Sequence, residues 1–241
     1  MSKKLYENVV IGNFLYGLGF AVRAKRGAVA TAAVVNLLQQ TPADTLLGDL
    51  LVEFPGVVRL IEFKSASNRS GKERARYQKL SSGLNGNARR QAISRSIHWY
   101  VETAPTEQGM EARIVPYLDA FSTRDRRDRL EAFIERTAEE VAGGTSDVSG
   151  EEAKSYLQWV RMTQGSGEVG TGGLFLFTDA EGKLHYAQLL DLMDLRLQHR
   201  HWLDRHEKRQ ERELVYQREL ERQMQLARSH SRGRSVGGPE L

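Results

Sequence analysis

The chain has 241 residues and a formal net charge of +4; 40% of its residues are hydrophobic and 27% charged, a balance typical of a globular protein with one good core. No apolar run reaches the roughly 18–20 residues of a membrane span, and no cleavable apolar segment follows the basic start Ser2–Lys4, so we expect neither a membrane protein nor a signal peptide. Zero cysteines exclude disulfides and thiolate metal sites and favour a cytoplasmic protein.

The first part of the chain predicts two helices followed by a hairpin. Residues 5–16 place apolar side chains roughly on one side of a helix, and the alanine-rich residues 27–40 predict a second, buried helix. The apolar runs 45–54 and 57–65 are separated by a Pro-Gly dipeptide at 55–56, which favours a turn, so we expect an antiparallel β-hairpin.

Helices and strands are expected to alternate after this hairpin. In chain order they are a helix from about Gly71 to a break at 83–86, a helix at 87–95, strands at 96–103 and 112–121, and a helix from a cap at 122–125 to about Val141. The first of these helices is supported by a capping box, because Ser70 precedes Glu73 by three residues.

The remainder of the chain predicts a linker at 143–150, a helix capped by Ser149 and Glu152 that ends at about Met162, and a hairpin within 174–189. We divide the chain into a core at 1–142, a linker, helix and hairpin at 143–188 that pack on or extend this core, a long charged helix at 189–228, and a disordered tail at 229–241.

The predicted long helix at 189–228 contains neither proline nor glycine, begins apolar and then becomes highly charged. Alternating steps of three and four residues give a poor heptad seam. Two interpretations remain open. Its first half docks on the core while the rest stays a free charged helix, or the helix packs on a protein partner, of which a homodimeric coiled coil is one form.

Three charged residues, Asp49, Glu62 and Lys64, interrupt the apolar runs of the predicted hairpin. With 55–56 as the loop, Asp49 stands directly opposite Glu62, and Lys64 projects beside Glu62 on the same face. Like charges placed in this way destabilise a hairpin, so the arrangement calls for a chemical reason. Glu53, which the same register moves away from Lys64, is interpreted as a solvated or structural acid.

Two opposed carboxylates among aliphatic side chains invite a shared proton or a divalent cation. Oxygen ligands without histidine or cysteine nearby favour Mg²⁺ or Mn²⁺. An adjacent lysine can deprotonate or position a water and can stabilise negative charge on a phosphate. These are the parts that phosphodiester hydrolysis requires. The plain alternative is an ordinary salt bridge of Lys64 with Glu62 or Asp49 on an exposed face.

The segment that follows the hairpin is strongly basic. Residues 64–95 hold nine Lys/Arg and a single acid, Glu73, and a field of this kind attracts polyanions. The predicted nucleic-acid contacts are Arg69, Lys72, Arg74, Arg76, Lys79, Arg89 and Arg90. Non-specific phosphate binding is the expected mode, because no helix-turn-helix, zinc or RNP motif is visible. A solvated charged face is the alternative.

Asp49, a gap of 12 residues, and then Glu62-Phe63-Lys64 at the end of an apolar strand resemble the active-site motif of the PD-(D/E)xK nuclease superfamily. The order of elements over residues 5–121 also resembles the core of that superfamily: a helix, a hairpin carrying the motif, a basic helix and a further strand. The chain departs from the family in having glycine before the aspartate and in lacking the Gln-x-x-x-Tyr motif of some subfamilies.

The resemblance implies an α/β fold, a restriction-endonuclease-like core with a central mixed sheet flanked by helices. It implies that Asp49 and Glu62 bind Mg²⁺ (or Mn²⁺), that the Phe63 carbonyl assists them, and that Lys64 activates or orients the attacking water. Many members add an acid from the first helix, a role that only Glu7 could fill here. The product would carry a 5′-phosphate.

We therefore predict a Mg²⁺-dependent endonuclease that acts on DNA rather than RNA, as part of a defence or mobile-element system. The alternative is a non-catalytic subunit that retains the nuclease fold and recruits nucleic acid to a multiprotein assembly. The cleavage of DNA by the purified protein would separate the two.

Overall fold

The computed structural model describes residues 5–27, 32–38, 47–68, 71–107, 109–121, 127–144, 146–165, 173–178, 184–189, 212 and 215–225. The chain divides into two compact units, Met1–Leu197 and Gln198–Leu241. In the second unit the described residues 212 and 215–225 are helical and exposed. Of the predicted helix at 189–228, Leu189 instead ends a strand, and the remaining residues, like the tail at 229–241, lie outside the described ranges.

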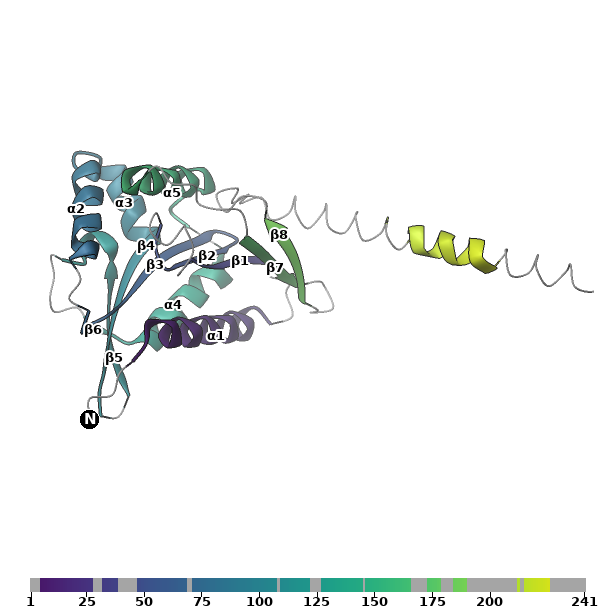
Figure 1. The fold of residues 1–241 in the computed structure, drawn as a ribbon, viewed down its shortest axis with the longest axis horizontal. Helices are drawn as coiled ribbons and strands as arrows, with labels where there is room; N and C mark the ends of the chain where they lie inside the picture. Colours follow the sequence, from purple (N-terminus) through teal and green to yellow (C-terminus); the bar gives the residue numbers. More distant parts are fainter. Residues whose placement is uncertain are drawn as a thin grey trace, which may run out of the picture. The chain divides into compact units, whose positions relative to one another are not determined.

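The first unit is an α/β structure built on one mixed sheet (Figure 1). Its described strands are β1 (Ala32–Leu37), β2 (Leu50–Phe54), β3 (Val57–Ser65), β4 (His98–Pro105), β5 (Met110–Pro116), β6 (Arg127–Asp128), β7 (Gly173–Thr178) and β8 (Leu184–Leu189). They lie in the order β6-β5-β4-β3-β2-β1-β7-β8. Of the described pairings, β3 with β4 is parallel and the others are antiparallel.

Helices cover both faces of this sheet (Figure 1). The described helices are α1 (Glu7–Arg26), α2 (Lys72–Leu84), α3 (Ala88–Ile97), α4 (Leu130–Gly143) and α5 (Gly150–Gln164), with a short 3₁₀ turn, η1, at Tyr117–Asp119. Helices α1 and α4 contact each other on one side of the sheet, and α2, α3 and α5 contact one another on the other side. The crossover from β3 to the parallel strand β4 consists of α2 and α3, as a parallel pair requires.

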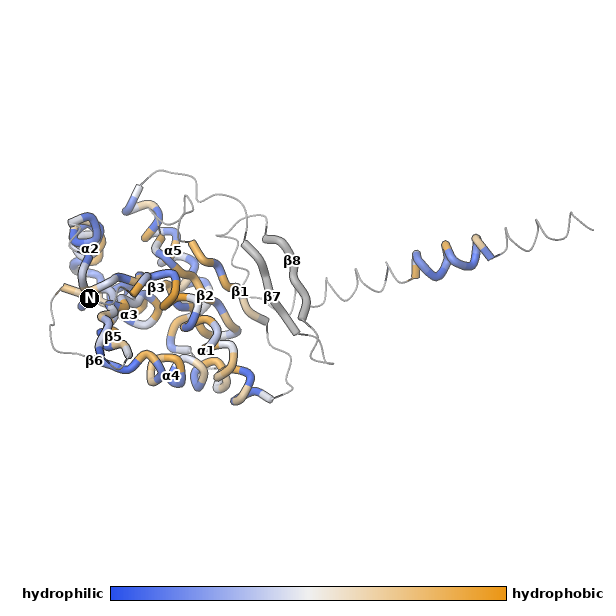
Figure 2. Tube along the Cα trace, turned by 60° about the horizontal axis from the view of Figure 1, so that its bottom comes forward, coloured by the Kyte–Doolittle hydropathy of each residue, from blue (hydrophilic) through white to orange (hydrophobic). Residues whose placement is uncertain are grey.

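The main hydrophobic core lies between the sheet and the α1–α4 layer. Phe14 of α1 is fully buried, with its ring edge-on to Phe63 of β3 at 5.7 Å and stacked on Phe133 of α4 at 5.9 Å. Figure 2 shows hydrophobic residues along β1, β2 and β3, whereas α2 and the C-terminal helix are mainly hydrophilic. The rings of Phe14 and Phe133 therefore pack against the strand that carries the Glu62-Phe63-Lys64 motif, on its α1–α4 side.

The prediction of an alanine-rich helix at 27–40 is wrong. Residues Ala32–Leu37 form β1, which pairs with β2 on one side and with β7 on the other. The two β-branched residues at 34–35 suit a strand, and pairing on both edges outweighs the helix propensity of alanine. Gly27, with φ of 60°, caps the C-terminus of α1 just before this segment.

The first helix is longer than predicted, because α1 continues from Glu7 through the glycines to Arg26. Its apolar face continues with Leu18 and Val22, which are buried, so packing outweighs the cost of glycine in the helix. A Cβ on Gly17 would approach Ile134 Cδ1 to 3.1 Å. Glycine at this position therefore permits the close approach of α4.

The predicted hairpin is confirmed, and its register is the expected one. Leu51 pairs with Leu60 and Phe54 with Val57 across β2 and β3. The helix after the break at 83–86, the strand predicted at 96–103 (here 98–105) and the hairpin of β7 and β8 are also present. The strand predicted at 112–121 is present only as 110–116, because Tyr117–Asp119 form the 3₁₀ turn η1. The capping box of α5 is formed, since Ser149 Oγ accepts from the Glu152 N–H while Glu152 accepts from the Ser149 N–H.

Helix α2 begins at Lys72 with Gly71 as its N-cap, close to the predicted start; Ser70, the predicted capping residue, lies outside the described residues. The start of the next predicted helix differs from expectation. Helix α4 begins at Leu130, because the preceding residues Arg127–Asp128 pair with β5 as the short strand β6. Pairing at the edge of the sheet therefore outweighs helix formation at 127–128.

The hairpin of β7 and β8 belongs to the same sheet as the first six strands, since β7 pairs with β1. Helix α5 contacts α2 and α3. Residues 150–189 thus add an edge to the sheet and a helix to one of its layers. Within the described ranges, none of the helices combines the length and the hydropathy of a bilayer-spanning segment.

The contact between α2 and α5 gives a test of packing. A Cβ on Gly83 would lie 2.8 Å from Trp159 Cζ2, whereas a Cβ on Gly12 of α1 would meet nothing within 4 Å. We expect Gly83→Ala to lower the free energy of unfolding by about 1 kcal/mol, because the indole must shift. Gly12→Ala should raise it by about 0.5–1 kcal/mol through helix propensity. Denaturant unfolding of both variants measures the difference, and equal effects would contradict this packing.

Candidate active site

The three charged residues of the hairpin meet at the β2–β3 end of the central sheet. Asp49 directly precedes β2, and Glu62 and Lys64 lie on β3. The Asp49 carboxylate reaches across, and its Oδ2 accepts a hydrogen bond of 2.7 Å from the Phe63 N–H. This backbone contact holds Asp49 beside the Glu62-Phe63-Lys64 motif, as the predicted register requires.

The Lys64 ammonium lies among three oxygen atoms. Its Nζ is 3.4 Å from Asp49 Oδ2 and 3.0 Å from the Phe63 carbonyl oxygen, and it forms a short ion pair with Glu62 Oε1. Asp49 and Glu62 are only 2% and 1% exposed. The ion pairs of Lys64 with Glu62 and Asp49 that the alternative predicts are present, but they are buried and not on an exposed face, so a cation already lies where the carboxylate oxygens converge.

Burial and neighbouring charges perturb both partners of this ion pair. Burial, with repulsion from Asp49 and Glu73, raises the pKa of Glu62 well above its usual range, although Lys64 and Arg76 oppose the shift. Burial lowers the pKa of Lys64, but the Glu62 and Asp49 carboxylates outweigh it and the net shift is upward. Both pKa values are thus shifted upward, and perturbed pKa values at a cluster of buried charges are characteristic of functional sites.

Gly48 shapes the floor of this site. Its φ of +150° is a conformation that residues with a side chain rarely adopt, and a Cβ here would come within 3.2 Å of Glu62 Oε2. Glycine therefore lets the backbone before Asp49 pass close to the Glu62 carboxylate. The glycine before Asp49, at which the chain departs from the motif it resembles, therefore has a local steric explanation.

Glu7 contacts the backbone of the motif strand, and its role as a further metal ligand stays a prediction. Its Oε1 accepts a hydrogen bond of 2.9 Å from the Ser65 N–H, so the carboxylate holds the end of β3. Among the residues that the structure describes, no three acidic or histidine side chains are grouped as a set of metal ligands. The first helix thus supports the motif strand from its N-terminus.

The donor set nevertheless fits a hard cation such as Mg²⁺. Asp49 Oδ2, Glu62 Oε1 and the Phe63 carbonyl oxygen converge on one position, which the Lys64 ammonium takes. Mg²⁺ is commonly held by one or two carboxylates while water and substrate phosphate complete its coordination. These three oxygens would hold the ion, with Lys64 moved aside to face its remaining ligands.

Three further residues form a chain of polar contacts behind Glu62: Arg76, Glu73 and Tyr117. The sequence analysis did not place Glu73 or Tyr117 at the site. Arg76 Nη1 of α2 lies 3.4 Å from Glu62 Oε1 and 3.3 Å from Glu73 Oε2. Glu73 in turn accepts a hydrogen bond from the Tyr117 hydroxyl. The i, i+3 spacing of Glu73 and Arg76 was visible in the sequence, but no local signal connected Tyr117 to them.

The predicted phosphate contacts on α2 separate into two groups. Lys72, Arg74 and Lys79 are exposed, whereas Arg76 turns inward to the carboxylates. Arg69 lies outside the described residues. The outward-facing side chains of α2 thus keep the basic surface that the composition predicted, and Arg76 does not contribute to it in this conformation.

The two arginines of α3 bind within the protein. The Arg89 guanidinium makes two hydrogen bonds to the Glu152 carboxylate, at 2.7 and 2.8 Å, and one to the Asp147 carbonyl. Arg90 lies over the Trp159 ring, 5.5 Å from its centroid. Both residues therefore fasten α3 to α5 in this structure, and their predicted contact with nucleic acid would compete with these interactions.

Glu53 is neither exposed nor part of the site. It pairs with Val58 as the register predicts, and it is 0% exposed. The interpretation as a solvated acid is wrong, and the structural alternative stands: the residue lies in a central strand of the sheet, where no water reaches it.

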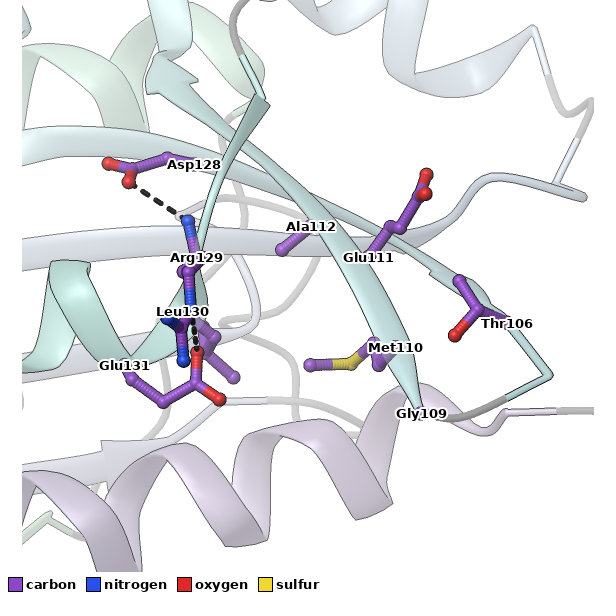
Figure 3. Close-up of a pocket in the computed structure, with 9 residues that line it drawn as sticks. All are labelled: Thr106, Gly109, Met110, Glu111, Ala112, Asp128, Arg129, Leu130 and Glu131. Carbon is purple, nitrogen blue, oxygen red and sulfur yellow. Dashed lines mark hydrogen bonds and ion pairs between the residues drawn. The ribbon is translucent and has the colours of Figure 1, made fainter.

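A depression of about 560 Å³ lies away from these residues, beside the start of α4 (Figure 3). Glu111, Asp128 and Glu131 line it, and the Asp128 carboxylate accepts from the Arg129 N–H. Its apolar wall includes Ala112, which belongs to the core beneath α1 and α4. The depression therefore lies on the α1–α4 side, whereas Glu62 faces α2.

No protein-family model matches the chain, and the searches of curated proteins and of solved structures found no significant match.

Proposed function

We propose that the protein is a metal-dependent nuclease with a restriction-endonuclease-like core that hydrolyses phosphodiester bonds of DNA. One observation carries the proposal: Asp49, Glu62 and the Phe63 carbonyl converge on a single cation position. Burying two carboxylates in an apolar hairpin is costly, and a cation shared between them offsets that cost. The succession α1, β2–β3 hairpin, α2–α3 and parallel β4 supports the assignment of the core.

The residues divide the chemistry among themselves. Mg²⁺, when bound, supplies positive charge to a phosphate oxygen and lowers the pKa of a bound water. Asp49, oriented by the Phe63 N–H, and Glu62 hold the ion from the β2–β3 side. Lys64, the neighbouring donor, turns its ammonium to the scissile phosphate, where it orients the attacking water and offsets the charge that develops on the phosphate oxygens.

The exposed flank of α2 supplies the approach surface. At 3.6 residues per turn, Lys72 and Lys79 lie within about 20° of each other around the helix, on the same flank as Arg76 and hence toward the site. Arg74 lies about 160° away from Lys72. Phosphates beside the site would meet the two lysines and not Arg74.

This difference in placement is testable with matched variants. The double variant Lys72→Gln/Lys79→Gln should bind duplex DNA more weakly, with a plot of log affinity against log salt that is shallower by about 1.8, for two lost phosphate contacts. Arg74→Gln should leave this slope unchanged. Fluorescence anisotropy in EDTA at several salt concentrations gives both values; an equal loss for Arg74→Gln would mean that the whole helix is a diffuse basic surface.

The experiment that tests the activity itself is cleavage by the purified full chain. Supercoiled plasmid, linear duplex, single-stranded DNA and RNA are each incubated with Mg²⁺ or Mn²⁺, and with EDTA as the control. We expect DNA to be cut only with the metal. Binding of DNA without cleavage of any substrate would favour the alternative, a recruiting subunit that retains the nuclease fold.

A further inference from the structure

Arg76 differs from the other basic residues of α2 because its guanidinium forms ion pairs with buried carboxylates and does not point into solvent. Its guanidinium lies 3.4 Å from Glu62 Oε1 and 3.3 Å from Glu73 Oε2, and its side chain is only 20% exposed. From the basic composition of residues 64–95, Arg76 was predicted to be one of the contacts to nucleic-acid phosphates. Its contacts instead make it a bridge between the candidate metal-binding carboxylate on β3 and an acid on α2.

Glu73, the partner of Arg76 on α2, is itself buried and hydrogen-bonded. Glu73 is 7% exposed and accepts from the Tyr117 hydroxyl, whose pKa is raised by burial and by Glu73 itself, so that it stays a donor. The Tyr117 ring stacks on His98 with centroids 4.2 Å apart and an interplanar angle of 8°. Tyr77, next to Arg76 in α2, donates to the Leu118 carbonyl and ties the same helix to the same turn.

His98 extends the buried network to α5. Burial, assisted by the Arg76 guanidinium, lowers the pKa of His98 to about 3, so the ring is neutral. Its Nδ1 is hydrogen-bonded to Tyr156 Oη at 3.0 Å, and this hydroxyl is 2.7 Å from Ser94 Oγ. These hydrogen bonds and the stacked rings link the turn that carries Tyr117 to α3 and α5, and they limit the movement of the hydroxyl that binds Glu73.

The site needs a second cation that stays in place. Three carboxylates, those of Asp49, Glu62 and Glu73, face two cations, Lys64 and Arg76. The Lys64 ammonium takes the position where a metal ion would lie, so it must leave the carboxylate oxygens when the ion binds. Arg76 contacts Glu62 from the α2 side and can remain there.

We propose that Arg76, held by Glu73 and Tyr117, is a positioning residue that orients the Glu62 carboxylate for metal binding. The inference rests on the proposed nuclease function, and it assigns to Arg76, Glu73 and Tyr117 a role in that site which their sequence positions do not suggest. Arg76 acts through Glu62 and makes no contact with substrate phosphate.

Arg76→Met and Arg74→Met form a matched pair, since each removes one positive charge from α2. Arg76→Met should lower kcat roughly 10- to 100-fold and weaken Mn²⁺ binding, followed by electron paramagnetic resonance without DNA, while leaving DNA affinity and its salt slope in EDTA unchanged. Arg74→Met should leave kcat and Mn²⁺ binding unchanged. If Arg76→Met instead altered only DNA affinity and its salt slope, Arg76 would be a phosphate contact and the inference would fall.

Tyr117→Phe is the milder probe if Arg76→Met fails to fold. It removes one hydroxyl and keeps the ring that stacks on His98. We expect a smaller loss of kcat with KM unchanged, together with weaker Mn²⁺ binding. Wild-type Mn²⁺ affinity and kcat in this variant would show that the Glu73–Tyr117 contact does not position Arg76.

A double-mutant cycle tests the bridge without any activity. The loss in the thermal midpoint caused by Arg76→Met should shrink by roughly half in the Glu62→Gln background, because one of the two carboxylate partners of Arg76 has already been removed and only Glu73 remains. Equal losses in both backgrounds would overturn the bridge even if the protein cuts DNA. A wild-type protein that binds no Mn²⁺ and cuts nothing would defeat the nuclease proposal instead, with the cycle still reporting on the bridge.

Discussion

Asp49→Asn and Lys64→Ala should each reduce metal-dependent DNA cleavage by at least about 100-fold while leaving the fold intact. Asp49 would lose a full negative charge at the cation position, although an amide oxygen could still accept the Phe63 N–H. Lys64→Ala removes the one ammonium that lies among the three oxygens. Initial rates of plasmid nicking with Mg²⁺ and with Mn²⁺ measure both effects.

Although both variants should lose cleavage, they should differ in their affinity for Mn²⁺. Asp49→Asn should also weaken Mn²⁺ binding, because it alters a ligand. Lys64→Ala should bind Mn²⁺ at least as tightly as the wild type, since no ammonium competes for the oxygens. Unchanged far-ultraviolet circular dichroism and a cooperative thermal transition would show that each variant is folded.

The acids of the depression beside α4 provide the control for this experiment. Asp128→Asn and Glu131→Gln change carboxylates that line the depression (Figure 3). Asp128 pairs with Arg136 of α4, whereas Glu62 lies beside Arg76 of α2 on the other side of the sheet. Neither should reduce cleavage by more than about twofold. Full nicking by Asp49→Asn and Lys64→Ala, or its loss in Asp128→Asn, would remove the catalytic assignment from the hairpin.

Phe14→Ala should lower the free energy of unfolding by about 3–5 kcal/mol, a large part of the about 5–15 kcal/mol that holds a typical domain together. Phe14 is 0% exposed and contacts the rings of Phe63 and Phe133, so its loss leaves a cavity beneath the motif strand. Urea unfolding followed by tryptophan fluorescence gives the difference from the wild type.

Phe20 on the same helix is the matched control, because 71% of it is exposed. Phe20→Ala should change the free energy of unfolding by no more than about 0.5 kcal/mol. A comparable loss for both variants would show that the exposed face of α1 is also packed, for example against another molecule. Reduced Mn²⁺ binding in Phe14→Ala alone would link the core beneath Phe63 to the geometry of the site.

Much of the site could be predicted because its determinants are local. The Pro-Gly turn at 55–56 and the alternation of side chains along β2 and β3 decide the register, and the register brings Asp49 to Glu62 and Lys64. The capping box at Ser149 and Glu152 likewise depends on four consecutive residues. Where neighbours in sequence supply the interaction, the sequence alone was sufficient.

Other features depended on partners far away in the chain. Residues 32–37 have the composition of a helix, yet they form β1 because β2 and β7 pair with both of its edges. Glu7 was expected at the metal, and its carboxylate accepts a hydrogen bond from the N–H of Ser65, 58 residues later. Its position in the sequence gave no indication of this backbone contact.

By itself, the sequence determined the hairpin, the three residues of its charged cluster and the basic character of the helix that follows. The tertiary structure decided that the two carboxylates are buried and that Arg76 turns toward them while Lys72 and Lys79 remain exposed. The physical reason is the Tyr117–Glu73 hydrogen bond, which joins residues 44 positions apart and fixes the acid to which Arg76 turns. Charge and spacing are local properties, whereas burial and the choice of ion-pair partner arise only when distant segments pack together.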